Sequence, residues 1–160
     1  MRQASASFYE AARIVALNSL GKFPSGASVR NVPSMSPKKA KKILRRGTAI
    51  DPPKITAADA ETALLPRLAG SYAAYHFCSG KIDAELSAAI AVESAGIIGT
   101  LAGSLGTDEA MKIVAWIDQR AQDIVANGWP AIVSIANALF DRGDLAASEI
   151  QQILNERAVL

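Results

Sequence analysis

The feature that most constrains the fold is a run of 20 residues with a single charge. The stretch LSAAIAVESAGIIGTLAGSL, from Leu86 to Leu105, contains only Glu93 as a charged residue. Membrane-spanning helices consist mostly of Leu, Ile, Val and Phe, whereas this run is rich in Ser, Gly and Ala around a carboxylate. Small residues let neighbouring helices approach closely, and the spacing of Gly99 and Gly103 favours such packing. We therefore expect a buried central helix in a folded domain, and no membrane insertion.

The composition agrees with a helical domain whose helices pack through small residues. Half of the 160 residues are hydrophobic, 20% are charged and only 6% are aromatic. A chain of this length is enough for one domain with a sizeable core, so we expect a single domain over residues 1–160. Trp116 and Trp129 lie among apolar neighbours at helical spacing, and we expect both to pack in the core.

The cysteine content and the first residues bear on the compartment. Cys78 is the only cysteine, which excludes an internal disulfide, and the sequence has no cluster of zinc-binding residues around it. This pattern is typical of a reducing compartment. The first residues, MRQASASFYEAAR, lack the continuous apolar run of a signal peptide. We expect a cytoplasmic protein.

Helix signals recur along the chain and predict a mainly α fold. We expect a single-domain bundle of about six to seven helices, with at most one small β-hairpin near residues 27–34. After Asp83 the helical pattern continues almost to the end of the chain. The predicted helices cover residues 7–21, 36–47, 56–79, 86–102, 107–126, 129–140 and 147–157.

Capping residues and helix breakers set several of these boundaries. Ser7 and Glu10 have the spacing of a capping box, and so do Thr56 and Asp59. The dipeptide Asn127-Gly128 predicts the end of one helix, and the Trp-Pro pair directly after it predicts the start of the next.

Three stretches occur in an order that is typical of one peptidase family. SFYEAARIVALNSLGK, from Ser7, has the frame of an H-E-x-x-H helix and is followed by the short stretch SVRNV. LAGSYAAYHFCSG begins at Leu68, and WPAIVSIANALFDRGDLAASEIQQIL begins at Trp129. Together they resemble the peptidase domain of the FtsH-type ATP-dependent zinc metalloproteases, and most closely the small stand-alone relatives that lack the ATPase. The resemblance implies a helical scaffold built around a zinc site.

The positions that would carry the zinc chemistry are changed. Tyr9 and Arg13 stand where the resemblance implies histidines, and an arginine offers no lone pair to a cation. A tyrosine, with an ordinary pKa near ~10, is a poor ligand at neutral pH. Glu10 stands at the general-base position without a metal-bound water to activate, and the third ligand of the family, an aspartate, would correspond to Asp83. The resemblance thus implies a degenerate site, with no metal, no cofactor and no enzymatic activity.

The single histidine does not restore a metal site in this interpretation. His76 and Cys78 are two residues apart on a predicted helix, so their side chains point to different faces. We expect His76 to be a structural residue and Cys78 to pack as a small apolar side chain.

Two interpretations of Arg13 stay open. In the first, its guanidinium fills the vacated zinc cavity and pairs with Glu10 or with a later acid, Asp83 or Glu93, placing fixed positive charge and forked donors there. In the second, Arg13 is a surface residue whose neighbour Glu10 contributes a few tenths of a kcal/mol at the i,i+3 spacing. A separation above about 6 Å from every carboxylate would exclude the first, since a close ion pair needs ~4 Å.

The strongest charge feature is the stretch SPKKAKKILRRG, residues 36–47. It contains six positive charges and no negative one, whereas the whole chain has a net charge of +2, so the remainder carries +2 − 6 = −4. On a helix the stretch is amphipathic, which suits an acidic protein surface, phosphates or anionic lipid, and a simply solvated face is the alternative. No aromatic residues are interleaved for base stacking. The candidate binding residues are Lys38, Lys39, Lys41, Lys42, Arg45 and Arg46.

These observations favour a protein that acts by binding. We expect a catalytically inactive, metalloprotease-like pseudoenzyme that serves as a protein-binding, regulatory or inhibitory module and recognises an acidic surface of a protein partner. A nucleic-acid-associated regulator that uses the basic helix at 36–47 is the alternative, and residual hydrolase activity is the third possibility.

Overall fold

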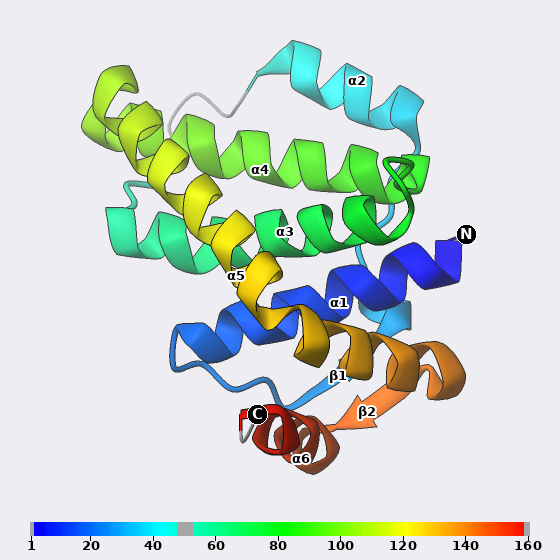
Figure 1. Ribbon diagram of the computed structural model, residues 1–160. Helices are drawn as coiled ribbons and strands as arrows, with labels where there is room; N and C mark the ends of the chain where they lie inside the picture. The colour runs from blue at the N-terminus through cyan, green and yellow to red at the C-terminus, as the bar shows by residue number, and fades with distance from the viewer. Residues whose placement is uncertain (1, 48–52, 159–160) are drawn as a thin grey trace.

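Helices account for most of the chain in the computed structural model, which describes residues 2–47 and 53–158 (Figure 1). A two-stranded antiparallel sheet pairs β1 (Gly26–Ser28) with β2 (Asp144–Ala146), and a short 3₁₀ helix, η1 (Val29–Asn31), follows β1. The expected mainly α bundle with a small β element is confirmed. The helices are α1 (Arg2–Ser19), α2 (Pro37–Arg46), α3 (Ala57–Phe77), α4 (Ala84–Leu105), α5 (Thr107–Arg142) and α6 (Ala147–Ala158).

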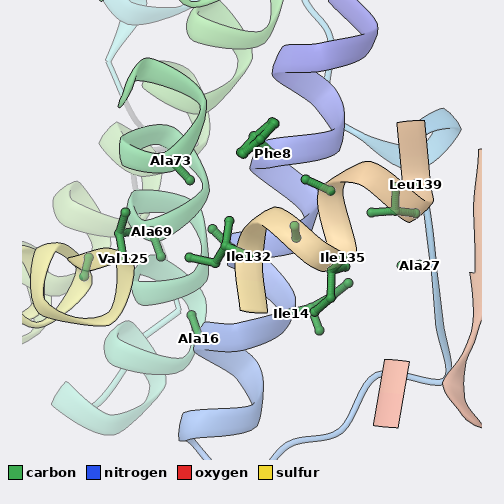
Figure 2. Packing of buried hydrophobic residues seen from close by; sticks show 14 of the residues in the cluster. Phe8, Ile14, Ala16, Ala27, Ala69, Ala73, Val125, Ile132, Ile135 and Leu139 are labelled. Carbon is green, nitrogen blue, oxygen red and sulfur yellow. The ribbon is translucent and has the colours of Figure 1, made fainter. Parts of the chain in front are cut away.

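The centre of the fold is α1, which packs against both α3 and α5. Small residues make this possible, because Ala11, Ala12 and Ala16 leave room for neighbouring helices on several sides of α1 and are fully buried. Figure 2 shows Phe8 of α1, Ala73 of α3 and Ile132 of α5 pointing into one shared space. Burial of a large aliphatic side chain such as Ile132 contributes about 1.5–3 kcal/mol.

The expectation that residues 86–105 form the buried central helix is wrong. They lie in α4, which is placed beside α3 and is covered by α2 on its outer side (Figure 1). The large apolar residues of α4 recur on one face. Burial of that face removes most of these side chains from solvent and leaves the side rich in Ala, Ser and Gly partly exposed. The buried residues of α4 are Leu86, Ala89, Ile90, Ser94 and Leu101.

Helix α4 is the one helix in the described part of the chain that is long and apolar enough to cross a membrane. Its mean hydropathy reaches 1.5 over 18 residues, and 22% of that window is buried. Length and composition of a single helix are weak evidence for a membrane span, because core helices of soluble proteins have the same properties.

The first helix begins at Arg2 rather than at the predicted start, Ser7. The hydroxyl of Ser7 donates to the backbone carbonyl of Gln3, 2.9 Å away, and therefore sits inside the helix instead of capping it. A serine can satisfy its hydroxyl on the carbonyl four residues earlier, so the capping-box spacing did not force a helix start here. The predicted end is confirmed, with Gly21 at a φ of 69° just after the helix.

Helix α5 runs without a break through Asn127-Gly128, so the two helices predicted at 107–126 and 129–140 are one. Pro130 lies inside the helix, and Figure 1 shows α5 changing direction between its yellow and orange parts, as expected for an internal proline. The absence of a side chain at Gly128 lets α5 approach α1, since a Cβ there would lie 3.1 Å from Cγ1 of Val15. Packing on both sides of the proline outweighs the local stop signal.

Other local signals are confirmed. Thr56 and Asp59 form a full capping box at the start of α3, and Ser36 accepts a hydrogen bond from the Lys39 backbone N–H at the start of α2. The β element predicted near residues 27–34 is present as the strand β1, whose partner β2 comes from the C-terminal part of the chain, with Ala27 opposite Leu145.

The two tryptophans differ in their environments. Trp129 packs against the core through Phe8 and is partly buried, as expected. Trp116 is 54% exposed, so its predicted place in the core is wrong, and the guanidinium of Arg120 lies 5.5 Å from the centre of its ring. Neighbouring apolar residues on α5 face the core through another side of the helix, which leaves Trp116 outside.

Candidate functional site

Helix α1 carries all three residues of the altered H-E-x-x-H frame. Tyr9 and Glu10 are almost completely buried, with 1% and 3% of their surfaces exposed. The side chain of Arg13 is 34% exposed, one turn further along the helix. Two polar side chains of the central helix are therefore buried against its neighbours, where each needs a partner to offset the loss of water.

Arg13 supplies that partner for Glu10. Its Nε donates to Oε2 of Glu10 and its Nη2 donates to Oε1, both at 2.7 Å. This bidentate geometry is the strongest form of ion pair between these groups. The hydrogen bond with Glu10 raises the pKa of the Arg13 guanidinium, against the opposite effect of burial. Both carboxylate oxygens of Glu10 thus accept a hydrogen bond from a permanent cation.

The structure shows the Arg13–Glu10 pair, which both interpretations of Arg13 contain. The pair is far closer than the 6 Å that would have excluded the first interpretation, and Glu10 is the partner among the three acids considered. A simple surface pair is not what is observed, because the Glu10 side chain is only 4% exposed. Occupation of a former zinc cavity by the guanidinium stays a prediction that rests on the resemblance alone.

Tyr9 and Glu93 belong to a second polar group beside this pair. Glu93 of α4 accepts from Nε of Arg67 of α3 at 2.7 Å, and so does not pair with Arg13. Burial, and next the negative charge of Glu93, raise the pKa of Tyr9 to about 12. Tyr9 therefore stays a neutral phenol at physiological pH and is unsuited to binding a metal as phenolate.

Asp83 has a local role instead of joining the altered frame. Its Oδ1 accepts hydrogen bonds from the backbone N–H groups of Glu85 and Leu86, each 3.1 Å away, and so caps the N-terminus of α4. Aspartate is one of the preferred residues at this position because it satisfies N–H groups that the helix leaves free. The predicted third member of the degenerate site is thus a capping residue.

No group of three or more His, Cys, Asp or Glu side chains comes together in residues 2–47 and 53–158. His76 is exposed near the end of α3, with its ring edge-on to that of Trp129. The Sγ atom of Cys78 lies 3.2 Å from the hydroxyl oxygen of Ser5. The residues present at the altered frame, an ion pair and a buried phenol, do not fit the zinc ion that the resemblance implies.

Helix α2 displays its positive charge fully to solvent. All six of its lysines and arginines are exposed, and Ala40 is its only buried residue. None of the six forms an ion pair with an acid in the part of the chain that the structure describes. Figure 1 shows α2 on the outer side of α4, at the edge of the molecule away from α1. The predicted basic helix is confirmed as an element, and its charge has no internal partner.

An open groove of about 570 Å³ runs between α2 and α4. We call it the α2–α4 groove. Its floor is apolar and made of small residues of α4, while Leu44, which is 46% exposed, lies on its α2 side. Lys41 and Arg45 lie at the same side. The residues of α4 that line the groove are Ala84, Ser87, Ala88 and Ala91. The groove therefore combines an apolar floor with a cationic wall.

A second group of residues was not singled out from the sequence. Tyr72 and His76 of α3, with Gln122 and Trp129 of α5, line a hollow of about 430 Å³. Two signals for it were present, because residues 72, 75 and 76 share one helix face and residues 122, 125, 126 and 129 share another. That these two faces meet depends on how α3 and α5 pack, which helical spacing alone does not specify.

Comparison with known protein families, with characterised proteins and with solved structures finds no match for the chain. The resemblance to the FtsH-type peptidases therefore rests on the sequence motifs quoted above.

Proposed function

We propose that this protein is a binding module that recognises an acidic segment of a protein partner through α2 and the α2–α4 groove. The observation that carries the proposal is a row of six exposed cations without an acidic partner among the described residues, directly beside an apolar groove. Like charges held together on one short helix repel one another, so the arrangement costs stability unless a binding partner uses it.

The groove favours a protein partner with apolar side chains over a partner that offers only negative charge. Covering its apolar floor removes few polar groups from water and so costs little free energy. The exposed Leu44 offers an apolar side chain to a partner at the same place. A partner segment that presents apolar residues to Ala88 and Ala91 and acidic residues to Lys41 and Arg45 would satisfy both parts of the groove. An acidic amphipathic helix has this pattern.

The altered frame supports a role without hydrolysis. Glu10 is held by Arg13 in a bidentate pair, and Tyr9 stays protonated, so neither offers the base or the metal ligand that zinc hydrolysis needs. We therefore propose a pseudoenzyme that regulates its partner by occupying it, and an inhibitory role belongs to the same proposal. Fold resemblance with altered catalytic positions does not transfer the activity of a family.

The test is an affinity pull-down from native extract with and without nuclease. Wild-type protein is compared with a variant in which Lys38, Lys41, Lys42 and Arg45 are replaced by Glu. The matched control replaces four exposed lysines outside α2 by Glu and so has the same net charge. Those control positions are Lys22, Lys54, Lys81 and Lys112.

We expect a stoichiometric protein partner that survives nuclease, is lost with the α2 variant and is kept by the control variant. The groove is then tested with the captured partner, because Leu44→Ser removes exposed apolar surface without changing charge. We expect that substitution to weaken binding by about fivefold to tenfold, which corresponds to burial of part of a leucine side chain. Equal capture by wild type and the α2 variant would contradict the proposal.

A nucleic-acid partner is the second candidate, and one observation favours it. Five cations of α2 surround a further hollow of about 430 Å³ on their own side of the helix, which suits a phosphate group. In that case the captured material disappears with nuclease, and binding falls steeply as salt rises, with a slope that decreases when lysines are removed. The residues around this hollow are Lys38, Lys41, Lys42, Arg45 and Arg46.

A further inference from the structure

The hollow between α3 and α5 is a candidate ligand site that is separate from α2. It has a volume of about 430 Å³, which falls within the ~300–1,000 Å³ typical of small-molecule pockets. Four of its lining residues have aromatic rings, and we call it the aromatic hollow. Its main lining residues are Tyr72, Tyr75 and His76 of α3 and Gln122, Val125 and Trp129 of α5.

The rings of the aromatic hollow are held in place by the surrounding structure. Trp129 stacks on Phe8 of the core, with ring centres 5.6 Å apart, and the ring of His76 meets that of Trp129 edge-on at 4.7 Å. Tyr75 is 55% exposed and lies over the turn after α3, where its hydroxyl approaches Gly80. A ligand can therefore enter from solvent and meet aromatic rings that are already positioned.

One end of the aromatic hollow has a negative charge directly behind it. The hydroxyl of Tyr72 donates to Oδ1 of Asp118 at 2.6 Å, and Nε2 of Gln122 donates to Oδ2 at 2.9 Å. Burial, and next the hydrogen bond to Asp118, raise the pKa of Tyr72, which keeps this phenol protonated as the donor. The carboxylate of Asp118 is thus one hydrogen bond away from two lining residues.

The carboxylate of Asp118 has no ion-pair partner among the described residues. No lysine or arginine is among the described residues that line the aromatic hollow. Arg120, on the same helix, pairs with Glu61 instead. The hollow therefore has aromatic walls and a negative end, so an anion would find no donor cation there.

We propose that the aromatic hollow binds a small organic cation that carries a methylated ammonium group. The negative faces of aromatic rings attract such a cation, and its methyl groups pack on the same rings without needing hydrogen bonds. The charge of Asp118 adds a longer-range attraction that a neutral ligand of the same shape does not feel. A strongly hydrated metal ion would lose its water without gaining ligands, since the described walls offer few oxygen donors. This activity goes beyond the proposed function and does not depend on α2.

The test uses choline and 3,3-dimethylbutan-1-ol, a neutral alcohol of nearly the same shape in which carbon replaces the charged nitrogen. Binding is followed by the fluorescence of Trp129 in full-length protein that carries Trp116→Phe, because Trp116 is exposed and outside the hollow. We expect a saturable response to choline at millimolar concentrations. The neutral alcohol should bind about tenfold more weakly, since cation–π attraction in a partly desolvated site is of that size.

Three variants separate the parts of the site. Tyr75→Leu removes an aromatic wall and Asp118→Asn removes the charge, and each should lower choline affinity by about fivefold. Tyr75→Phe keeps the ring and should bind choline as wild type does. Equal affinity for choline and the alcohol, or an Asp118→Asn protein that binds choline normally, would overturn the proposal. So would the absence of any choline response, and the comparison of the two probes decides the matter even if Tyr75→Leu does not fold.

Discussion

The aromatic ring of Tyr9 lies directly on the backbone of Gly70. A Cβ atom at Gly70 would be 2.6 Å from Cδ2 of Tyr9 and 2.8 Å from its carbonyl oxygen. Side chains do not reach such distances without displacement of the neighbour, and here one neighbour is backbone. The contact therefore sets how closely α3 approaches α1, the central helix of the fold.

The first prediction is that Gly70→Ala destabilises the protein. We expect the free energy of unfolding to fall by about 2–3 kcal/mol, because overpacking costs more than the ~1 kcal/mol that alanine gains in a helix. Unfolding in urea measures the change. The matched control is Gly96→Ala in α4, where a Cβ would meet nothing within 4 Å, so the same substitution should leave stability unchanged or raise it slightly. A Gly70→Ala protein as stable as the control would contradict the close contact.

The second prediction concerns the pH dependence of stability through Tyr9. Its pKa in the folded protein is about 12, above the ordinary value of 10.0. A raised folded-state pKa means that the protonated phenol stabilises the fold below pH ~10 and that this contribution is lost as the pH rises towards ~12. The loss amounts to about 2–3 kcal/mol in total. Wild type should therefore lose stability more steeply above pH ~10 than Tyr9→Phe does.

Unfolding in urea at several alkaline pH values checks this difference. Tyr75→Phe is the control, because it removes the hydroxyl of an exposed tyrosine from the same protein. Parallel pH profiles for wild type and Tyr9→Phe would show that burial of Tyr9 does not control the alkaline limit of stability.

The third prediction is that Arg13→Ala lowers the free energy of unfolding. It leaves the carboxylate of Glu10 buried without its partner, and we expect a loss of about 2–3 kcal/mol, reduced from the usual 3–5 kcal/mol because Arg13 is partly exposed. The pair of Lys112 with Glu109 has the same i,i+3 spacing but is exposed, so Lys112→Ala should change stability by less than ~0.5 kcal/mol. Similar losses for both substitutions would contradict a buried role for Glu10.

The double substitution Glu10→Leu with Arg13→Met extends this prediction. Replacement of both charges by apolar groups of similar size should recover most of the stability that Arg13→Ala loses, because no buried charge remains. Urea unfolding of wild type, of the single variants Glu10→Leu and Arg13→Met and of the double variant forms a double-mutant cycle that gives the coupling between the two positions. A coupling near zero would mean that Glu10 is stabilised by other groups.

The fourth prediction is that zinc does not stabilise the protein. A ligand at one hundred times its dissociation constant raises the free energy of unfolding by about 2.7 kcal/mol, which is readily seen as a shift in the thermal midpoint. The Arg13–Glu10 pair and the buried phenol of Tyr9 offer no set of zinc ligands, so zinc and a chelator should both leave the midpoint unchanged. A saturable upward shift with zinc, abolished by Glu10→Gln, would overturn our assignment of the altered frame.

Some parts of the candidate sites could be predicted from the sequence and others could not. The basic helix was predictable with its boundaries, because Ser36, Pro37 and Gly47 act within one turn of the ends that they define. The pairing of Arg13 with Glu10 was also within reach, since residues three apart on a helix are neighbours. The partner of Glu93 could not be predicted from the sequence, because Arg67 lies 26 positions away on another helix.

The sequence by itself determined the local structure: the helical class, the capping box at Thr56 and Asp59, and the charge of α2. These features depend on groups within a few residues of one another, so they hold wherever the helix is placed. Only the tertiary structure decided that α1 is central, that α5 continues through Pro130 and that the aromatic hollow exists. Each of these depends on surfaces far apart in the chain, and the burial of apolar residues on both sides of Pro130 outweighs the local preference to stop.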